Sequence, residues 1–122
     1  IELGNVTIAM DTTYNNWGTV TLTALDGKSM NESSNVLLVV AGRAENTGMG
    51  WNDEMNSVGT EWGIAPTIAE GLPVKITLNE MDNFKLYTLD PAGNQGSEIK
   101  IAKKKGTQVL NLGAQYKPYG IF

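Results

Sequence analysis

The sequence contains no cysteine and no histidine among its 122 residues. The absence of cysteine excludes a disulfide framework, a thiolate nucleophile and a cysteine metal site. The absence of histidine removes the commonest general base and the commonest zinc ligand. Any enzyme built on this chain would therefore have to work with carboxylates alone.

Long apolar runs and a basic face are also missing. No stretch reaches the roughly 20 apolar residues that a membrane-spanning helix needs, so we expect no membrane contact. The net charge is -4, the sequence pI is near 4.7, and the one dense basic run is Lys103 to Lys105. Because phosphate binding requires a basic face rather than one basic turn, nucleic acid is not an expected partner.

The length fits one domain, because an independent domain usually needs on the order of 100 residues to bury a sufficient core. The chain starts at Ile1, without an initiator methionine or a charged and then apolar leader. We interpret it as a processed or excised piece of a larger protein. Residues 1–122 are therefore expected to form one module.

Apolar and polar residues alternate over much of the chain, which is typical of strands with one face in water. The alternating segments are residues 5–10, 19–24, 74–79 and 84–89, and two shorter segments with apolar residues lie at 99–101 and 109–112. Helical spacing is never sustained. The pattern predicts an all-β fold, an antiparallel two-sheet β-sandwich of the jelly-roll kind with about eight strands.

The order of the strands can be inferred at two places. Val36 to Ala41 is apolar without alternation, which predicts a central strand covered on both faces. Residues 79–83 form a short polar stretch, and we expect them to join the strands on either side of them as a hairpin.

Residues 43–66 follow no period and are rich in glycine and asparagine. We interpret this segment as a long structured loop. Loops of that length without their own secondary structure are uncommon in compact domains and are usually functional. The segment is therefore the first place to search for a site.

Acidic residues in this loop raise two chemical alternatives. A glycosidase needs two carboxyl groups on either side of the bond, and the candidates are Glu45, Asp53, Glu54 and Glu61. We interpret them instead as solvated or turn-holding groups, so no catalytic residue is assigned. Oxygen ligands suited to calcium are offered by Asn52, Asp53, Glu54 and Asn56, but their spacing matches no known calcium loop. No cofactor is expected, and a structural calcium with unassigned ligands stays open.

The aromatic residues are more informative. If the alternation of residues 19–24 extends upstream, Trp17 shares a face with Thr19, Thr21 and Thr23 and points toward water. Either a loop covers this ring or it is a stacking platform for the apolar face of a pyranose. Tyr14 lies in a polar stretch nearby and is a plausible second ring.

Two further tryptophans lie in the long loop. Trp51, between Gly50 and Asn52, is expected to be exposed. Trp62 precedes Gly63 and then the apolar pair Ile64-Ala65, so we expect it to enter the core.

Several short segments carry a resemblance to a known class of domain. They are residues 25–29, Leu37-Leu38, residues 42–49, Trp62-Gly63 and Ala65-Pro66. Together they resemble β-sandwich accessory domains of bacterial glycoside hydrolases and the carbohydrate-binding modules appended to them. The resemblance spans Val20 to Leu112, and residues 43–49 are its most specific part.

The resemblance implies a secreted, non-catalytic module that binds β-1,4-glucan, mixed-linkage glucan, xyloglucan or mannan and tethers a parent hydrolase. We expect its groove to be built from Trp17, Tyr14 and Trp51, with Asn46, Asn52 and Arg43 as polar partners. Trp62 is a further candidate ring, should it not enter the core. The tyrosines at 87, 116 and 119 are next in line should these rings not bind. Two alternatives stay open: a structural sandwich that packs on the catalytic domain without binding sugar, and a small glycosidase that uses only carboxylates.

Overall fold

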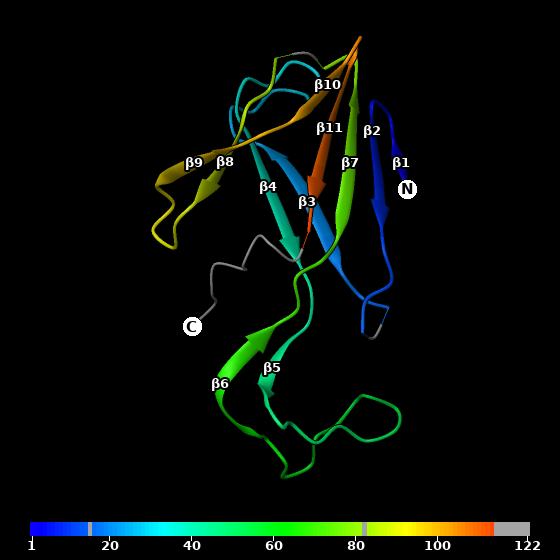
Figure 1. The fold of residues 1–122 in the computed structure, drawn as a ribbon, viewed down its shortest axis with the longest axis vertical. Helices are drawn as coiled ribbons and strands as arrows, with labels where there is room; N and C mark the ends of the chain where they lie inside the picture. The colour runs from blue at the N-terminus through cyan, green and yellow to red at the C-terminus, as the bar shows by residue number, and fades with distance from the viewer. Residues whose placement is uncertain (15, 82, 114–122) are drawn as a thin grey trace.

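The structure is a computed structural model that describes residues 1–14, 16–81 and 83–113. Tyr116 and Tyr119 lie outside these residues. The described part contains eleven strands and no helix, and all its strand pairs are antiparallel (Figure 1). It accordingly holds no helix that is long and apolar enough to cross a membrane. The all-β, antiparallel fold predicted from the sequence is confirmed, with eleven strands in the described residues where about eight were expected.

The strands form one larger sheet and three hairpins. The five-stranded sheet has the order β1-β2-β7-β11-β10, and the pairs β3-β4, β5-β6 and β8-β9 are separate two-stranded sheets. The strands are β1 Glu2–Leu3, β2 Val6–Met10, β3 Thr19–Ala24, β4 Val36–Ala41, β5 Ala44–Thr47, β6 Ile64–Ala69, β7 Val74–Asn79, β8 Leu86–Leu89, β9 Gln95–Ile99, β10 Ala102–Lys104 and β11 Thr107–Leu112.

Strand β7 is the centre of the large sheet. Its residue Ile76 lies opposite Ile8 of β2 and Leu110 of β11, and its side chain is fully buried. The alternation read from residues 74–79 is therefore the pattern of a strand with one face in the core. The buried apolar cluster consists of Val6, Ile8, Leu72, Val74, Ile76, Leu78, Met81 and Leu110.

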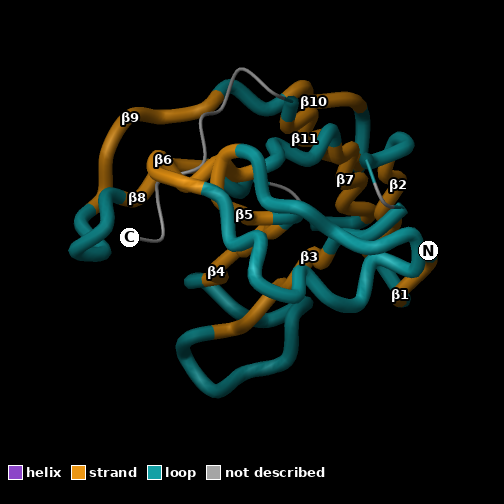
Figure 2. Tube along the Cα trace, turned by 90° about the horizontal axis from the view of Figure 1, so that it is seen from below, coloured by secondary structure: helices purple, strands orange, loops and turns teal. Residues whose placement is uncertain are grey.

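The β3-β4 hairpin forms the second layer. Val20, Leu22, Leu38 and Val40 pack against the buried cluster. Figure 2 shows β3 and β4 on one side of the row formed by β11, β7 and β2. Two antiparallel layers with an apolar interior are the arrangement of a β-sandwich.

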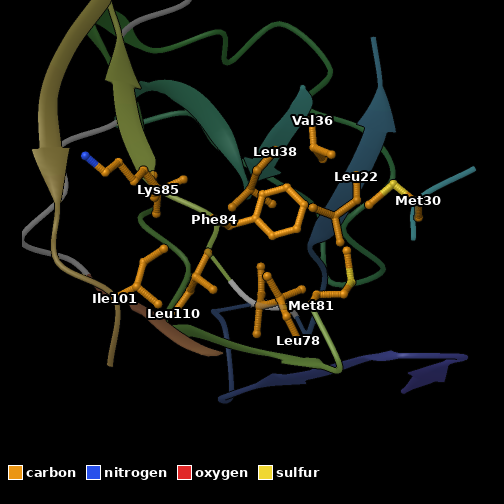
Figure 3. Close-up of a pocket in the computed structure, with 12 residues that line it drawn as sticks. Leu22, Met30, Val36, Leu38, Leu78, Met81, Phe84, Lys85, Ile101 and Leu110 are labelled. Carbon is orange, nitrogen blue, oxygen red and sulfur yellow. The ribbon is translucent and has the colours of Figure 1, made fainter. Parts of the chain in front are cut away.

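A small apolar cavity of about 50 Å³ lies between the two layers (Figure 3). Leu22 and Leu38 reach it from the hairpin, Leu78 and Leu110 reach it from the large sheet, and Phe84 also lines it. Apolar cavities of this kind are packing defects rather than polar binding sites.

The expectation that Val36 to Ala41 forms a central, doubly covered strand is wrong. Strand β4 pairs with β3 in a two-stranded sheet, and the side chain of Val39 is 45% exposed. Leu38 and Val40 face inward and pack on the core, and Val36 on the same face lines the small cavity. An unbroken apolar run does not report which of its faces is covered, so the sequence overstated the burial of this strand.

Two further expectations about connectivity are corrected. Residues 79–83 do not form a hairpin, because β7 pairs with β2 and β11 whereas β8 pairs with β9. Residues 43–66 are not one irregular loop, because β5 and the start of β6 lie within them. We call residues 44–69 the arm, since β5, β6 and their connection extend away from the rest of the molecule in Figure 1.

Candidate functional site

The connection between β2 and β3 meets the base of the arm at Glu70. The backbone N–H of Tyr14 donates to Oε1 of Glu70 at 2.8 Å, although 56 residues separate the two. The N–H of Glu70 donates in turn to the carbonyl oxygen of Arg43 at 2.7 Å. Glu70 therefore brings Tyr14 and Arg43, which are far apart in the sequence, to the same place.

Gly42 allows this close approach. A Cβ at position 42 would lie 2.8 Å from the carbonyl oxygen of Glu70 and 3.0 Å from Leu72 Cδ2. The first distance is shorter than real Cβ contacts, and the atom that it would meet belongs to the backbone. Leu72 is part of the buried cluster. The start of the arm is therefore fixed on the core at a position where only glycine fits.

An ion pair links two aromatic rings beside this junction. The guanidinium of Arg43 lies over the ring of Tyr14, with Cζ 3.8 Å from the ring centroid. Nη2 of Arg43 donates to Oε1 of Glu45 at 2.5 Å, and Nε1–H of Trp51 donates to Oε2 of the same carboxylate at 2.8 Å. The order of contact is thus Tyr14, Arg43, Glu45, Trp51, which we call the ring network.

The ring network combines shielded charges with exposed rings. The side chains of Arg43 and Glu45 are only 17% and 9% exposed. Tyr14 is 71% exposed and Trp51 is 37% exposed. A shielded and neutralised ion pair can hold a fixed geometry, whereas an open surface pair contributes little. The arrangement therefore presents two rings to solvent from a largely shielded support.

The two remaining tryptophans are also exposed. Trp17 is 50% exposed, as the pattern of the following strand predicted, and its carbonyl oxygen accepts a hydrogen bond from the Thr13 hydroxyl at 3.0 Å. Trp62 is 63% exposed, so the expectation that it enters the core is wrong. The apolar residues after it begin the exposed strand β6 of the arm, and Ile64 is itself 72% exposed.

Asn46 and Asn52 are not free polar groups. The amide of Asn46 donates to the carbonyl oxygen of Trp62 at 3.0 Å and accepts from the Thr67 hydroxyl at 3.0 Å, so it ties β5 to β6. Oδ1 of Asn52 accepts from the N–H groups of Asn56 and Ser57, and its Nδ2 donates to Glu54 and to Asn56. Both side chains therefore hold the arm in shape.

The acids of the arm do not gather into a centre. Both carboxylate oxygens of Glu45 are engaged in the ring network, and Oε2 of Glu54 accepts from Asn52. Within residues 1–14, 16–81 and 83–113, no three acidic side chains lie close enough together to hold a metal ion. The calcium alternative thus finds no group of three acidic ligands in the described part of the chain.

An open cleft of about 910 Å³ lies between β4 and β8. Aliphatic side chains of β4 form much of its lining, and Tyr87 and Lys85 contribute from the opposite side. Tyr87 is half-buried there. The cleft lacks the combination of exposed rings and fixed polar support that the ring network has.

The sequence identified three members of the ring network, namely Tyr14, Arg43 and Trp51, but offered no reason for them to meet. Glu45 was considered only as a candidate acid. Its spacing from Arg43 carries a usable signal, because residues two apart on a strand point to the same face. Glu70 was missed, and its role depends on contacts between distant segments that no local pattern reveals.

Comparison with known proteins gave no match: no family model, no curated protein and no solved structure is significantly similar to the chain.

Proposed function

We propose that the chain is a non-catalytic carbohydrate-binding module that holds a neutral β-linked polysaccharide of the plant cell wall on the rings of Tyr14 and Trp51. The observation that carries the proposal is the ring network, in which two exposed rings from separate segments share one shielded ion pair. The axial C–H groups of a β-linked pyranose form an apolar face that stacks on such rings.

Rigid support makes an exposed ring a better binding element. A ring that is already oriented loses little conformational freedom when a ligand stacks on it, so more of the contact energy appears as affinity. Trp51 is fixed by its indole N–H, and Tyr14 is fixed by its backbone N–H and by the guanidinium above its ring. Trp17 lies three residues beyond Tyr14 and adds a further exposed ring to the same connection.

The charge of the arm favours an uncharged glycan. The arm and its two flanking residues, 43–70, contain one base, Arg43, and five acids, a net charge of -4 that equals the net charge of the whole chain. Like charges brought together on binding are strongly unfavourable. Neutral chains such as β-1,4-glucan, mixed-linkage glucan, xyloglucan or mannan fit this surface, and polyuronates do not. The five acids are Glu45, Asp53, Glu54, Glu61 and Glu70.

The proposal assigns no catalysis to the chain. A glycosidase needs one carboxyl group that can give up a proton and a second that can attack or activate water. Glu45, the acid nearest the rings, already accepts hydrogen bonds at both oxygens. In keeping with the resemblance, the module would tether a glycoside hydrolase of the same secreted protein to its substrate.

A second candidate function is supported by a separate observation. All six residues of β6 are exposed, and the apolar side chains of Ile64 and Ile68 are 72% and 45% exposed. An exposed apolar strand can be a docking face for another domain. On this alternative the chain is a structural accessory domain that packs on a glycoside hydrolase catalytic domain and binds no sugar.

Calorimetric titration with a β-1,4-linked glucan hexasaccharide tests the proposal. Trp51→Ala should weaken binding by roughly tenfold to a hundredfold, because a stacked anchor residue contributes about 1 to 3 kcal/mol. Its melting curve should stay close to that of the parent. The matched control is Leu25→Ala, which removes an exposed apolar side chain at the β3–β4 connection, far from the arm, and should bind like the parent.

The ligand panel separates the candidate functions. A mannan or glucan oligosaccharide should bind, and a β-1,4-linked uronate oligosaccharide of equal length should bind at least about tenfold more weakly. If the parent protein gives no heat with any neutral glycan, the binding proposal is wrong and the docking alternative gains support. Release of reducing ends that is lost in Glu45→Gln would show that the chain is an enzyme.

A further inference from the structure

We infer that Arg43 and Glu45 are positioning residues of the proposed site: their ion pair sets the orientation of both rings and does not itself contact the sugar. This inference rests on the proposed function. It changes the role that the sequence suggested for Arg43, which was expected to be a polar partner of the ligand.

The geometry of the carboxylate supports this role. Glu45 uses one oxygen for Arg43 and the other for the indole N–H of Trp51. With 9% of its side chain exposed, it offers little surface to a ligand. A carboxylate that accepts a hydrogen bond at each oxygen is held in one orientation. The two side chains that donate to it are held in place in turn. The direction of the Trp51 indole is therefore set by Glu45.

The guanidinium supports the second ring in a similar way. Its Cζ lies 3.8 Å from the Tyr14 ring centroid, which places the flat group on one face of that ring. One face of Tyr14 is thus covered, and a sugar can stack only on the other. Because the same guanidinium is paired with Glu45, the two rings cannot be reoriented independently. The pair links an element of the β2–β3 connection to an element of the arm.

The β5 strand explains why these two residues act together. Arg43 immediately precedes β5 and Glu45 lies within it, so the two side chains are two positions apart on an extended chain. Glu45 is opposite Ile68 of β6 in the strand register, which holds it in the arm. The backbone carbonyl of Arg43 is bonded to the N–H of Glu70. Both ends of the ion pair are thus anchored in backbone that is already hydrogen-bonded.

The first experiment measures the solvent exchange of the Trp51 indole N–H in the absence of ligand, and the second measures binding. In the parent protein the Trp51 indole N–H signal, assigned by its loss in Trp51→Phe, should exchange with solvent several-fold more slowly than an unbonded indole. In Glu45→Ala this protection should disappear. Glu45→Gln retains one carbonyl oxygen and should retain part of the protection. Asp53→Asn removes the same charge from the same arm at an exposed side chain and should leave the indole signal unchanged.

Binding of the β-1,4-linked hexasaccharide is then compared across the same variants. Glu45→Ala should weaken binding by about tenfold. In a protein that already carries Trp51→Ala, the same substitution should weaken binding clearly less, because the effects of two residues that act as a unit are not additive. Arg43→Lys keeps the charge but loses the flat group over Tyr14, and it should weaken binding by severalfold. Melting curves identify any variant that fails to fold, and Glu45→Gln provides the milder change.

Two results would overturn the inference. One is an unchanged Trp51 indole exchange rate in Glu45→Ala. The other is that Glu45→Ala loses the protection of the Trp51 indole N–H but still binds the sugar as tightly as the parent, which would show that binding does not depend on a held ring. If the parent binds no glycan at all, the proposed function fails and with it the role in binding, while the exchange experiment still decides whether Glu45 orients the ring.

Discussion

Strands β7 and β6 show how differently two apolar strands of one chain can be used. In β7 every second residue is buried, and Ile76 has no exposed surface. In β6 all six residues are exposed, although the sequence Ile-Ala-Pro-Thr-Ile-Ala is no more polar. The first strand has partners on both sides, and the second has one partner, β5. Burial is decided by the neighbours of a strand, not by its own composition.

The body of the molecule and the arm are also held together by different interactions. The body of the molecule is held by its apolar cluster, whereas the arm is held by side-chain hydrogen bonds such as those of Asn46 and Asn52. Polar bonds of this kind contribute modestly to stability but fix geometry well. The body therefore provides stability, and the arm provides a shaped surface. This division fits the proposal that the arm, together with the adjoining Tyr14 and Arg43, carries the binding site.

The largest expected effect compares two isoleucines, one from each strand. Ile76→Ala should lower the free energy of unfolding by roughly 2 to 5 kcal/mol, because it removes a fully buried side chain and leaves a cavity. Ile64→Ala should change it by less than about 0.5 kcal/mol, since that side chain is 72% exposed. Urea unfolding of both variants measures the difference. Equal losses would mean that the arm is covered in solution.

The sequence predicted the body better than the arm, for a physical reason. Period-two patterns in residues 6–10, 19–24 and 74–79 became strands because one face of each meets the core. The arm lacks such a pattern, since a hairpin without a core face needs no alternation. The sequence also could not give the sheet order, because pairing β7 with β2 and β11 depends on contacts between distant segments.

An intermediate effect is expected at Leu38, which lies between the two extremes. It packs against the buried cluster and lines the small cavity, but its strand β4 is only half-buried. Leu38→Ala should therefore cost about 1 to 2 kcal/mol, less than Ile76→Ala, because part of the side chain is already hydrated and part of it faces the existing cavity rather than packed atoms. The same urea series provides the measurement. If Leu38→Ala lowers the free energy of unfolding as much as Ile76→Ala does, β4 is a central core strand after all.

The candidate site shows the same limit of sequence reasoning. Exposure of Trp51 followed from its polar neighbours, whereas the strand face of Trp17 left open whether a loop covers that ring. The burial expected for Trp62 failed because the apolar residues after it belong to the arm. The contact between Tyr14 and Arg43 depends on Glu70 and Gly42. No sequence pattern around either residue predicts this contact.

The smallest expected effect concerns a turn outside the arm. Asp26 accepts hydrogen bonds from the backbone N–H and the hydroxyl of Ser34 and from the N–H of Lys28. These bonds, that from the Ser34 N–H above all, lower the pKa of Asp26 from 3.8 to about 2. A carboxyl with a lowered pKa in the folded state stabilises the protein above pH 4 and loses that effect as the pH falls toward 2.

The stability difference between the parent and Asp26→Asn should therefore be present at pH 6 and shrink toward pH 2. Urea midpoints of the two proteins across this range measure it. Ligand binding by the arm, measured at pH 6, should be the same in both. A difference that is constant with pH would show that the Asp26 carboxylate is not held by these bonds.

The most direct measurement of the central claim is an amide and indole NMR titration of the parent protein with the β-1,4-linked hexasaccharide. We expect the Trp51 indole and the amides around Tyr14 and residues 43–45 to shift together and saturate with one dissociation constant, while the amides of β7 stay unchanged. Shifts confined to the cleft between β4 and β8, or no shift at all at saturating sugar, would contradict it.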